Sequence, residues 1–82
     1  MKGESYLTED QLLDIGFKEV GKNVRFSHKT SFYTPEKISI GSHVRIDDFC
    51  IISGDVRIGS YVHIASYTGL FGVYYGSCWR IS

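Results

Sequence analysis

The 82-residue sequence has only two cysteines, one proline and no excess of charge of either sign. Cys50 and Cys78 are too few to form the disulfide framework of a small secreted domain, so we expect a reducing, cytoplasmic setting. Nine basic and nine acidic residues give a formal net charge of zero. A strong positive charge is the usual mark of a protein that binds nucleic acid or an anionic membrane, and its absence argues against both partners.

The sequence also lacks long apolar segments. Its start, MKGESYLTED, contains no apolar stretch of the kind that defines a signal peptide. No run approaches the ~20 apolar residues that a membrane-spanning helix needs, so we expect no membrane insertion. A chain of this length forms one small domain with a modest core, which makes an oligomer or a longer parent chain worth considering.

What the sequence does contain is a six-residue period from Ile40 to Leu70. A period of six fits neither a surface helix nor an alternating strand, and repeated hexads are typical of β-helices. The fifth residue of one block and the first of the next are two positions apart, so both point to the same face of a short strand. The first positions are Ile40, Ile46, Ile52, Ile58, Ile64 and Leu70, and the fifth positions are Val44, Cys50, Val56, Val62 and Thr68.

Three such strands close one triangular coil, so residues 18 positions apart should stack at the strand spacing of ~4.8 Å. The period extends back to Val20 if two extra residues near Pro35 form a longer corner loop. The result is an all-β, parallel β-helix of about two and two-thirds coils, built from eight hexad faces. The predicted core comprises Val20, Val24, Phe26, Thr30, Phe32, Ile38, Ile40, Val44, Ile46, Cys50, Ile52, Val56, Ile58, Val62, Ile64, Thr68 and Leu70.

Residues 7–17 are predicted to form a short capped helix. Thr8 and Gln11 have the spacing of a capping box, and Gly16 can end the helix in a left-handed conformation. A helix of about two turns is not stable alone, so its apolar side must lie on another element. We expect it to cover the open end of the β-helix, with a partner-binding role as the alternative; the apolar residues concerned are Leu12, Leu13 and Ile15.

The period is expected to stop after Gly72, because the next block would open on Gly76 instead of an aliphatic residue. We therefore divide the chain into a capping segment at 1–19, the β-helix at 20–72 and an aberrant tail at 73–82. Either the tail folds over the exposed end of the β-helix, or the reading frame is disrupted or the chain truncated near residue 72.

The segments IGSHVRI and VRIGSYVHIA, with their inward aliphatic rows, resemble the hexapeptide-repeat acyltransferases. The resemblance implies that the fold is a left-handed parallel β-helix. IDDFCIISG followed by IGSYVHIASYTGLFG is similar to the galactoside acetyltransferase-like sugar O-acetyltransferases, including those of surface-polysaccharide gene clusters. The resemblance covers about Val20 to Gly72 and matches the N-terminal portion of such an enzyme. It implies a homotrimer that binds acetyl-CoA and a sugar or oligosaccharide acceptor in grooves between neighbouring β-helices, with a histidine as general base and no metal.

The resemblance therefore implies acetyl transfer from acetyl-CoA to a sugar hydroxyl. Family members continue for several more coils, which carry much of the CoA site, so we expect weak or absent activity from this chain as it stands. A non-enzymatic β-helix fragment or trimerisation module remains the alternative, since one fold hosts several functions.

Three histidines are candidates for the general base. His63 lies between two inward residues and points outward, where it could take a proton from an acceptor hydroxyl or be an ordinary surface histidine. His43 lies in IGSHV, a phrase found around the catalytic histidine of galactoside acetyltransferases, but it occupies an early corner. His28 is a weaker candidate. A zinc site of the carbonic anhydrase type would need close histidine spacing, which none of the three provides, and we expect no metal.

Other polar residues have candidate roles. Asp47 and Asp48 follow Ile46 at a corner, where they could bind sugar hydroxyls or be solvated turn residues. Arg45 and Arg57 point outward and could meet CoA phosphates, a neighbouring subunit or solvent. Cys50 takes an inward position and is predicted to be a small buried side chain, not a nucleophile.

Overall fold

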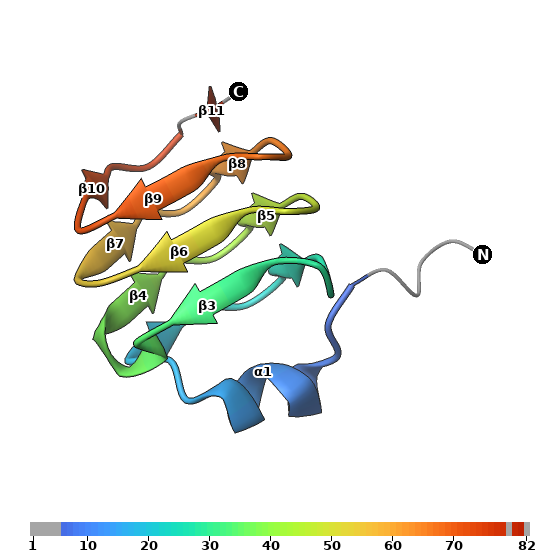
Figure 1. Ribbon diagram of the computed structural model, residues 1–82. Coiled ribbons are helices and arrows are strands. Elements are labelled where there is room, and N and C mark those ends of the chain that lie inside the picture. The colour runs from blue at the N-terminus through green and yellow to red at the C-terminus, as the bar shows by residue number, and fades with distance from the viewer. Residues whose placement is uncertain (1–5, 79, 82) are drawn as a thin grey trace.

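The chain forms a stack of parallel coils that is closed at one end by a helix (Figure 1). The computed structural model describes residues 6–78 and 80–81. Helix α1 spans Glu9–Ile15, and a short 3₁₀ helix spans Pro35–Lys37. The strands are β1 (Glu19–Val20), β2 (Arg25–Phe26), β3 (Ser31–Tyr33), β4 (Ile38–Ile40), β5 (Arg45–Ile46), β6 (Ile51–Ser53), β7 (Val56–Ile58), β8 (His63–Ile64), β9 (Gly69–Phe71), β10 (Tyr74–Tyr75) and β11 (Arg80–Ile81).

The strands form three parallel sheets, one for each side of the coil. Their orders are β1-β4-β7-β10, β2-β5-β8-β11 and β3-β6-β9. Every third strand therefore pairs with its counterpart in the next coil, which is the arrangement that the hexads predicted. The fold is a left-handed parallel β-helix. Strands β1 to β9 complete three turns, and β10 and β11 begin a fourth.

The stacking register follows the sequence spacing. Ile40 pairs with Ile58, as expected for positions 18 apart. In the first coil the spacing is 20, so that Phe26 pairs with Ile46. The two extra residues lie in the corner occupied by the 3₁₀ helix, which confirms the predicted corner loop.

Among the described residues, the buried apolar side chains of the coils are aliphatic apart from Phe26 and Cys50, and Phe17 and Phe32 are partly buried against them. Predicted core positions that are only partly buried belong to the first coil or carry a hydroxyl. Thr30 donates its hydroxyl to the Asp47 carbonyl at 2.9 Å, and Thr68 donates to the Ala65 carbonyl at 2.8 Å, so both threonines satisfy corner carbonyls instead of filling the core. The buried apolar residues are Leu12, Phe26, Ile38, Ile40, Val44, Ile46, Cys50, Ile52, Val56, Ile58, Val62, Ile64 and Leu70.

Helix α1 has the predicted capping box. The Thr8 amide donates to Gln11 Oε1 at 2.8 Å, and the Gln11 amide donates to Thr8 Oγ1 at 3.2 Å. Gly16 ends the helix with φ of 85°. Leu12 packs into the core, but the prediction for Leu13 was wrong, because 73% of it is exposed. A helix of seven residues presents one narrow side to the coil, and consecutive residues point in different directions around the axis.

The corners repeat a left-handed backbone conformation at equivalent positions. Asn23, His43 and Tyr61 have φ of 58°, 58° and 60°, and each begins the segment leading into a strand of the second sheet. The amides of His43 and Tyr61 donate to the carbonyls of Lys22 and Ser42, at 2.9 Å in both cases. Non-glycine residues adopt this conformation infrequently, and the coil-to-coil hydrogen bonds hold it here.

The strand pairing continues past Gly72, which differs from the expectation that the pattern stops there. Tyr75 pairs with Ile58, so the spacing falls to 17. The physical reason is a shortened corner, which shifts the phase of the hexads by one position and hides the period in the sequence. Trp79 lies outside the described residues. The proposed division at residue 72 and the disrupted reading frame stay predictions.

Candidate functional site

The candidate site lies on the outer side of the sheet formed by β2, β5 and β8. Parallel pairing places Arg25 beside Arg45 and Arg45 beside His63. These residues alternate with the inward residues Phe26, Ile46 and Ile64, so their side chains point away from the core. The register confirms the predicted position of His63 above Arg45.

Asp47 links two members of this row. Its Oδ1 accepts a hydrogen bond from Arg45 Nε at 2.9 Å, and its Oδ2 lies 2.9 Å from His63 Nε2. The side chains of Asp47 and His63 are 20% and 28% exposed, so the pair is partly shielded from solvent. The three residues form one hydrogen-bonded cluster across two successive coils.

The electrostatics of the cluster fix the protonation of the histidine nitrogen that faces the carboxylate. Burial alone would raise the pKa of Asp47, but the hydrogen bonds from His63 and Arg45 outweigh it, and the pKa lies below its ordinary value. An ionised carboxylate only accepts hydrogen bonds, so His63 Nε2 carries the proton. His63 Nδ1 is then the ring nitrogen that can accept a proton from another molecule. The same ion pair raises the pKa of Arg45 further above its usual value.

Asp48 has a different partner from its neighbour. Its carboxylate accepts a hydrogen bond from the hydroxyl of Ser27, which is buried at 1% exposure. Ser27 Oγ in turn accepts from the Lys29 amide at 3.0 Å. Asp48 therefore binds to the corner of the first coil, while Asp47 binds Arg45 and His63 on the outer side of the sheet.

A pocket of about 270 Å³ lies beside these carboxylates. Tyr6 reaches it because residue 6 forms an antiparallel bridge with Ser27. Ser66 lies one coil above Asp48, at the 18-residue spacing, so the repeat itself could have identified it. No such signal exists for Tyr6, which precedes the periodic region. The pocket is lined by Tyr6, Ser27, Arg45, Asp47, Asp48 and Ser66.

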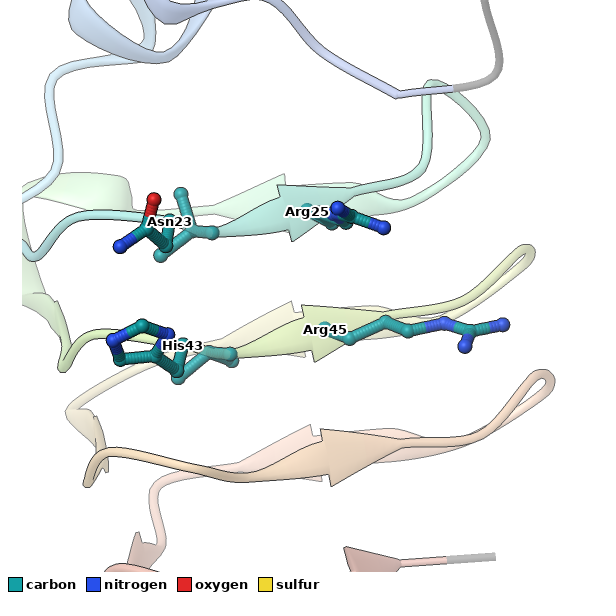
Figure 2. A pocket seen from close by; sticks show the side chains of 6 residues that line it. Asn23, Arg25, His43 and Arg45 are labelled. Carbon is teal, nitrogen blue, oxygen red and sulfur yellow. The ribbon is translucent and has the colours of Figure 1, made fainter. Parts of the chain in front are cut away.

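His43 belongs to a separate groove on the same side of the coil. Its ring stacks on Tyr61, with the ring centres 4.7 Å apart and the planes 8° from parallel. Figure 2 shows His43 opposite Asn23 at one end of this groove and Arg45 opposite Arg25 at the other. The structure therefore does not bring His43 into the pocket beside Asp47.

The other candidates lie elsewhere. His28 is exposed at a corner of the first coil. Arg57 is exposed on the sheet that contains β7. Cys50 is buried, and burial raises the pKa of its thiol, which opposes formation of a nucleophilic thiolate. Among residues 6–78 and 80–81, no three His, Cys, Asp or Glu side chains lie close enough to hold a metal ion. The same part of the chain contains no helix with the length and apolar character needed to cross a membrane.

The repeated coils match a known protein family. The model for "Bacterial transferase hexapeptide (six repeats)" matches residues 37–72. The chain belongs to the hexapeptide-repeat transferases. The sequence is 52% identical over 71 residues to an Escherichia coli dTDP-4-amino-4,6-dideoxy-D-glucose acyltransferase. That match covers 83% of this chain and 37% of the relative.

Solved structures of AntD, an N-acyltransferase from Bacillus cereus, show the same fold. The complex with dTDP and 3-hydroxybutyryl-CoA has a TM-score of 0.83 and 55% identity, covering 93% of this chain and 41% of AntD. A mutant bound to dTDP-4-amino-4,6-dideoxyglucose and coenzyme A has a TM-score of 0.82 and 58% identity, covering 88% and 38%. The predicted relationship to sugar acyltransferases is confirmed, and this hexapeptide-repeat transferase chain spans less than half the length of the relatives it matches.

Proposed function

We propose that the chain is part of an acyltransferase that moves an acyl group from acyl-CoA to the amino group of a nucleotide-linked amino sugar. The observation that carries this proposal is the 55% identity to AntD, whose structures contain dTDP and an acyl-CoA. The relatives act on, or are bound to, a 4-amino sugar, which favours an amine over the hydroxyl acceptor expected from the sequence. Acetyl-CoA is our proposed donor.

In this proposal His63 is the general base. The acceptor amine attacks the thioester carbonyl, a C–N bond forms, and the C–S bond to coenzyme A breaks. His63 Nδ1 takes a proton from the attacking nitrogen, and the departing thiolate finally receives one as the free thiol. Asp47 accepts the hydrogen bond from Nε2, which sets the tautomer and orientation of the ring. Thioester aminolysis of this kind needs no metal.

We further propose that the protein works as a cytoplasmic homotrimer. Large apolar side chains remain exposed on the outer surface of the coil, including Ile51 at 42%, Phe71 at 62% and Tyr74 at 72%. Contact between copies would cover such residues. Sedimentation equilibrium of the purified chain tests this, and a monomer at tens of micromolar would contradict it.

The acceptor can be identified with two matched substrates. The chain is incubated with acetyl-CoA and either dTDP-4-amino-4,6-dideoxyglucose or the corresponding 4-hydroxy sugar nucleotide, and released thiol is measured. We expect release with the amine alone, and at a low rate, because the chain spans less than half the length of its relatives. Release with the hydroxyl compound alone would establish O-acetyl transfer, and no release with either would favour a non-enzymatic module.

The proposed role of His63 as general base can be tested by substitution. We expect His63→Gln to lower kcat about 10²- to 10⁴-fold, the usual contribution of a general base. Asp47→Asn should have a smaller effect, because the amide can still contact the ring but does not select the same tautomer. Arg57→Gln, an exposed change on another sheet, serves as the control. Unchanged kcat in His63→Gln would remove this residue from the mechanism.

A further inference from the structure

The groove beside His43 is basic, and the acyl-transfer chemistry does not use it. It measures about 680 Å³ and runs between the first and second coils on the outer side of β2 and β5. Its polar lining consists of two guanidinium groups, one imidazole and one amide, from Arg25, Arg45, His43 and Asn23. Among the described residues that line the groove there is no carboxylate.

Two arginines at paired positions on the outer side of a sheet repel each other unless an anion binds them. Arg25 and Arg45 are register partners on parallel strands, so their backbones lie about 4.8 Å apart. Like charges directly opposite each other on a sheet destabilise it. Asp47 accepts a hydrogen bond from Arg45 Nε, a bond that does not use the terminal nitrogens of that guanidinium, so they can serve as further donors. In the described part of the chain no carboxylate lies within ion-pair distance of Arg25.

The opposite end of the groove is held by backbone and stacking contacts. Asn23 and His43 both occupy left-handed corners with φ of 58°. Tyr61 covers one face of the His43 ring, and the His43 amide is tied to the Lys22 carbonyl at 2.9 Å. Figure 2 shows two rows of side chains, Asn23 over His43 and Arg25 over Arg45, separated along the strands. Donors at both ends of a groove suit an extended anion with several oxygens better than a single carboxylate.

We propose that this groove binds the diphosphate of a nucleotide ligand, with Arg25 and Arg45 on one phosphate and His43 and Asn23 toward the other. The choice of a nucleotide rests on the proposed function, in which both substrates contain a diphosphate: the sugar nucleotide and coenzyme A. Arg45 lines both this groove and the pocket beside Asp47. A sugar nucleotide whose diphosphate lies in the groove can therefore place its sugar next to the proposed base.

Isothermal titration calorimetry of the full chain, at low salt and without magnesium, tests the groove with three probes: inorganic pyrophosphate, dTDP and coenzyme A. Arg25→Gln should weaken pyrophosphate binding about tenfold or more, since a charge-assisted hydrogen bond is lost. Arg25→Lys should retain part of the affinity, because it keeps the charge but not the fork of donors. Arg57→Gln removes one exposed arginine from a different sheet and should leave binding unchanged.

The probes distinguish the source of the diphosphate. If Arg25→Gln weakens the binding of dTDP and not that of coenzyme A, the groove holds the sugar nucleotide. If it weakens the binding of coenzyme A and not that of dTDP, the groove holds coenzyme A. No pyrophosphate binding by the wild type, or equal losses in Arg25→Gln and Arg57→Gln, would overturn the proposal. Because pyrophosphate binding requires no acyl transfer, failure of the groove and failure of the proposed function give separate results.

Discussion

The first coil and the middle coils fill the same triangular interior with different residues. In the middle coils, aliphatic side chains such as Ile46 and Ile64 repeat in register. At the end nearest the helix, Phe17, Phe26 and Phe32 form an aromatic cluster, with ring centres 4.9 to 5.9 Å apart. A middle coil is covered on both sides by copies of itself, whereas the first coil has a copy on only one side. The end of a repeat stack therefore needs larger side chains and a separate cap.

The largest expected loss of stability follows from a substitution in the aromatic cluster. We expect Phe26→Ala to destabilise the fold by about 3–5 kcal/mol, because it removes a fully buried ring from the junction of helix and coil. Urea unfolding monitored by circular dichroism measures this, with Leu13→Ala as the exposed control. A loss under 1 kcal/mol would mean that the helical end contributes little to stability, and the contrast between end and middle would fail.

The close stacking of the middle coils can be tested by adding a methyl group between two of them. A Cβ on Gly41 would lie 2.7 Å from the carbonyl carbon of Gly59, which is backbone and cannot move freely. We expect Gly41→Ala to cost about 1–3 kcal/mol through overpacking. Ser31→Ala, an exposed change on a strand of another sheet, is the control. Equal melting temperatures for the two variants would show that the coils separate more easily than the geometry indicates.

The cap itself has a smaller expected effect. Thr8→Ala removes half of the capping box and should destabilise the fold by about 1 kcal/mol. Thr8→Ser keeps the hydroxyl and should restore most of that stability. Thermal unfolding of the two variants measures the difference. If Thr8→Ala matches the wild type, helix formation is not coupled to folding of the first coil.

The smallest expected loss of stability concerns Asp47, which binds Arg45 and His63 on the outer side of the sheet. The pKa of Asp47 in the folded chain lies below its ordinary value of 3.8, so its pairing stabilises the fold above that pH and the stabilisation is lost as pH falls through the folded pKa. We expect Asp47→Asn to lose less than about 1 kcal/mol at pH 7, with the difference from wild type vanishing once the pH falls below the pKa of Asp47 in the folded chain. Unfolding curves across this range test it. A constant difference at all pH values would mean that charge is not involved.

The interior was predictable because a period of six permits few arrangements. Once Ile40 and Val44 point inward, the positions of Ile58 and Val62 follow, and the structure confirms them. The phase after Gly72 was not predictable in the same way, since one missing residue moves Tyr75 into a place that isoleucine occupies elsewhere.

The candidate site was predictable only in part. The hexads place His63 above Arg45, but they do not say which way the corner carboxylates turn. Asp47 bonds to the outer row and Asp48 to buried Ser27, although the two are adjacent and chemically identical. That divergence depends on side-chain directions at the corner, which the repeat pattern does not encode. The groove was missed for a related reason: the predicted corner loop already places Asn23 beside His43, but the repeat pattern does not show that their side chains line one groove with Arg25 and Arg45.

In the described part of the chain, all the differences in length between successive coils lie in one corner. Five residues separate Tyr33 from Ser39, three separate the equivalent Ser53 and Arg57, and two separate Phe71 and Tyr74. The strands on either side keep their partners in every case. This corner is thus a natural insertion point: peptides of different length could be grafted between residues 54 and 55 to give the scaffold new loops, while the proposed diphosphate groove on another side remains intact.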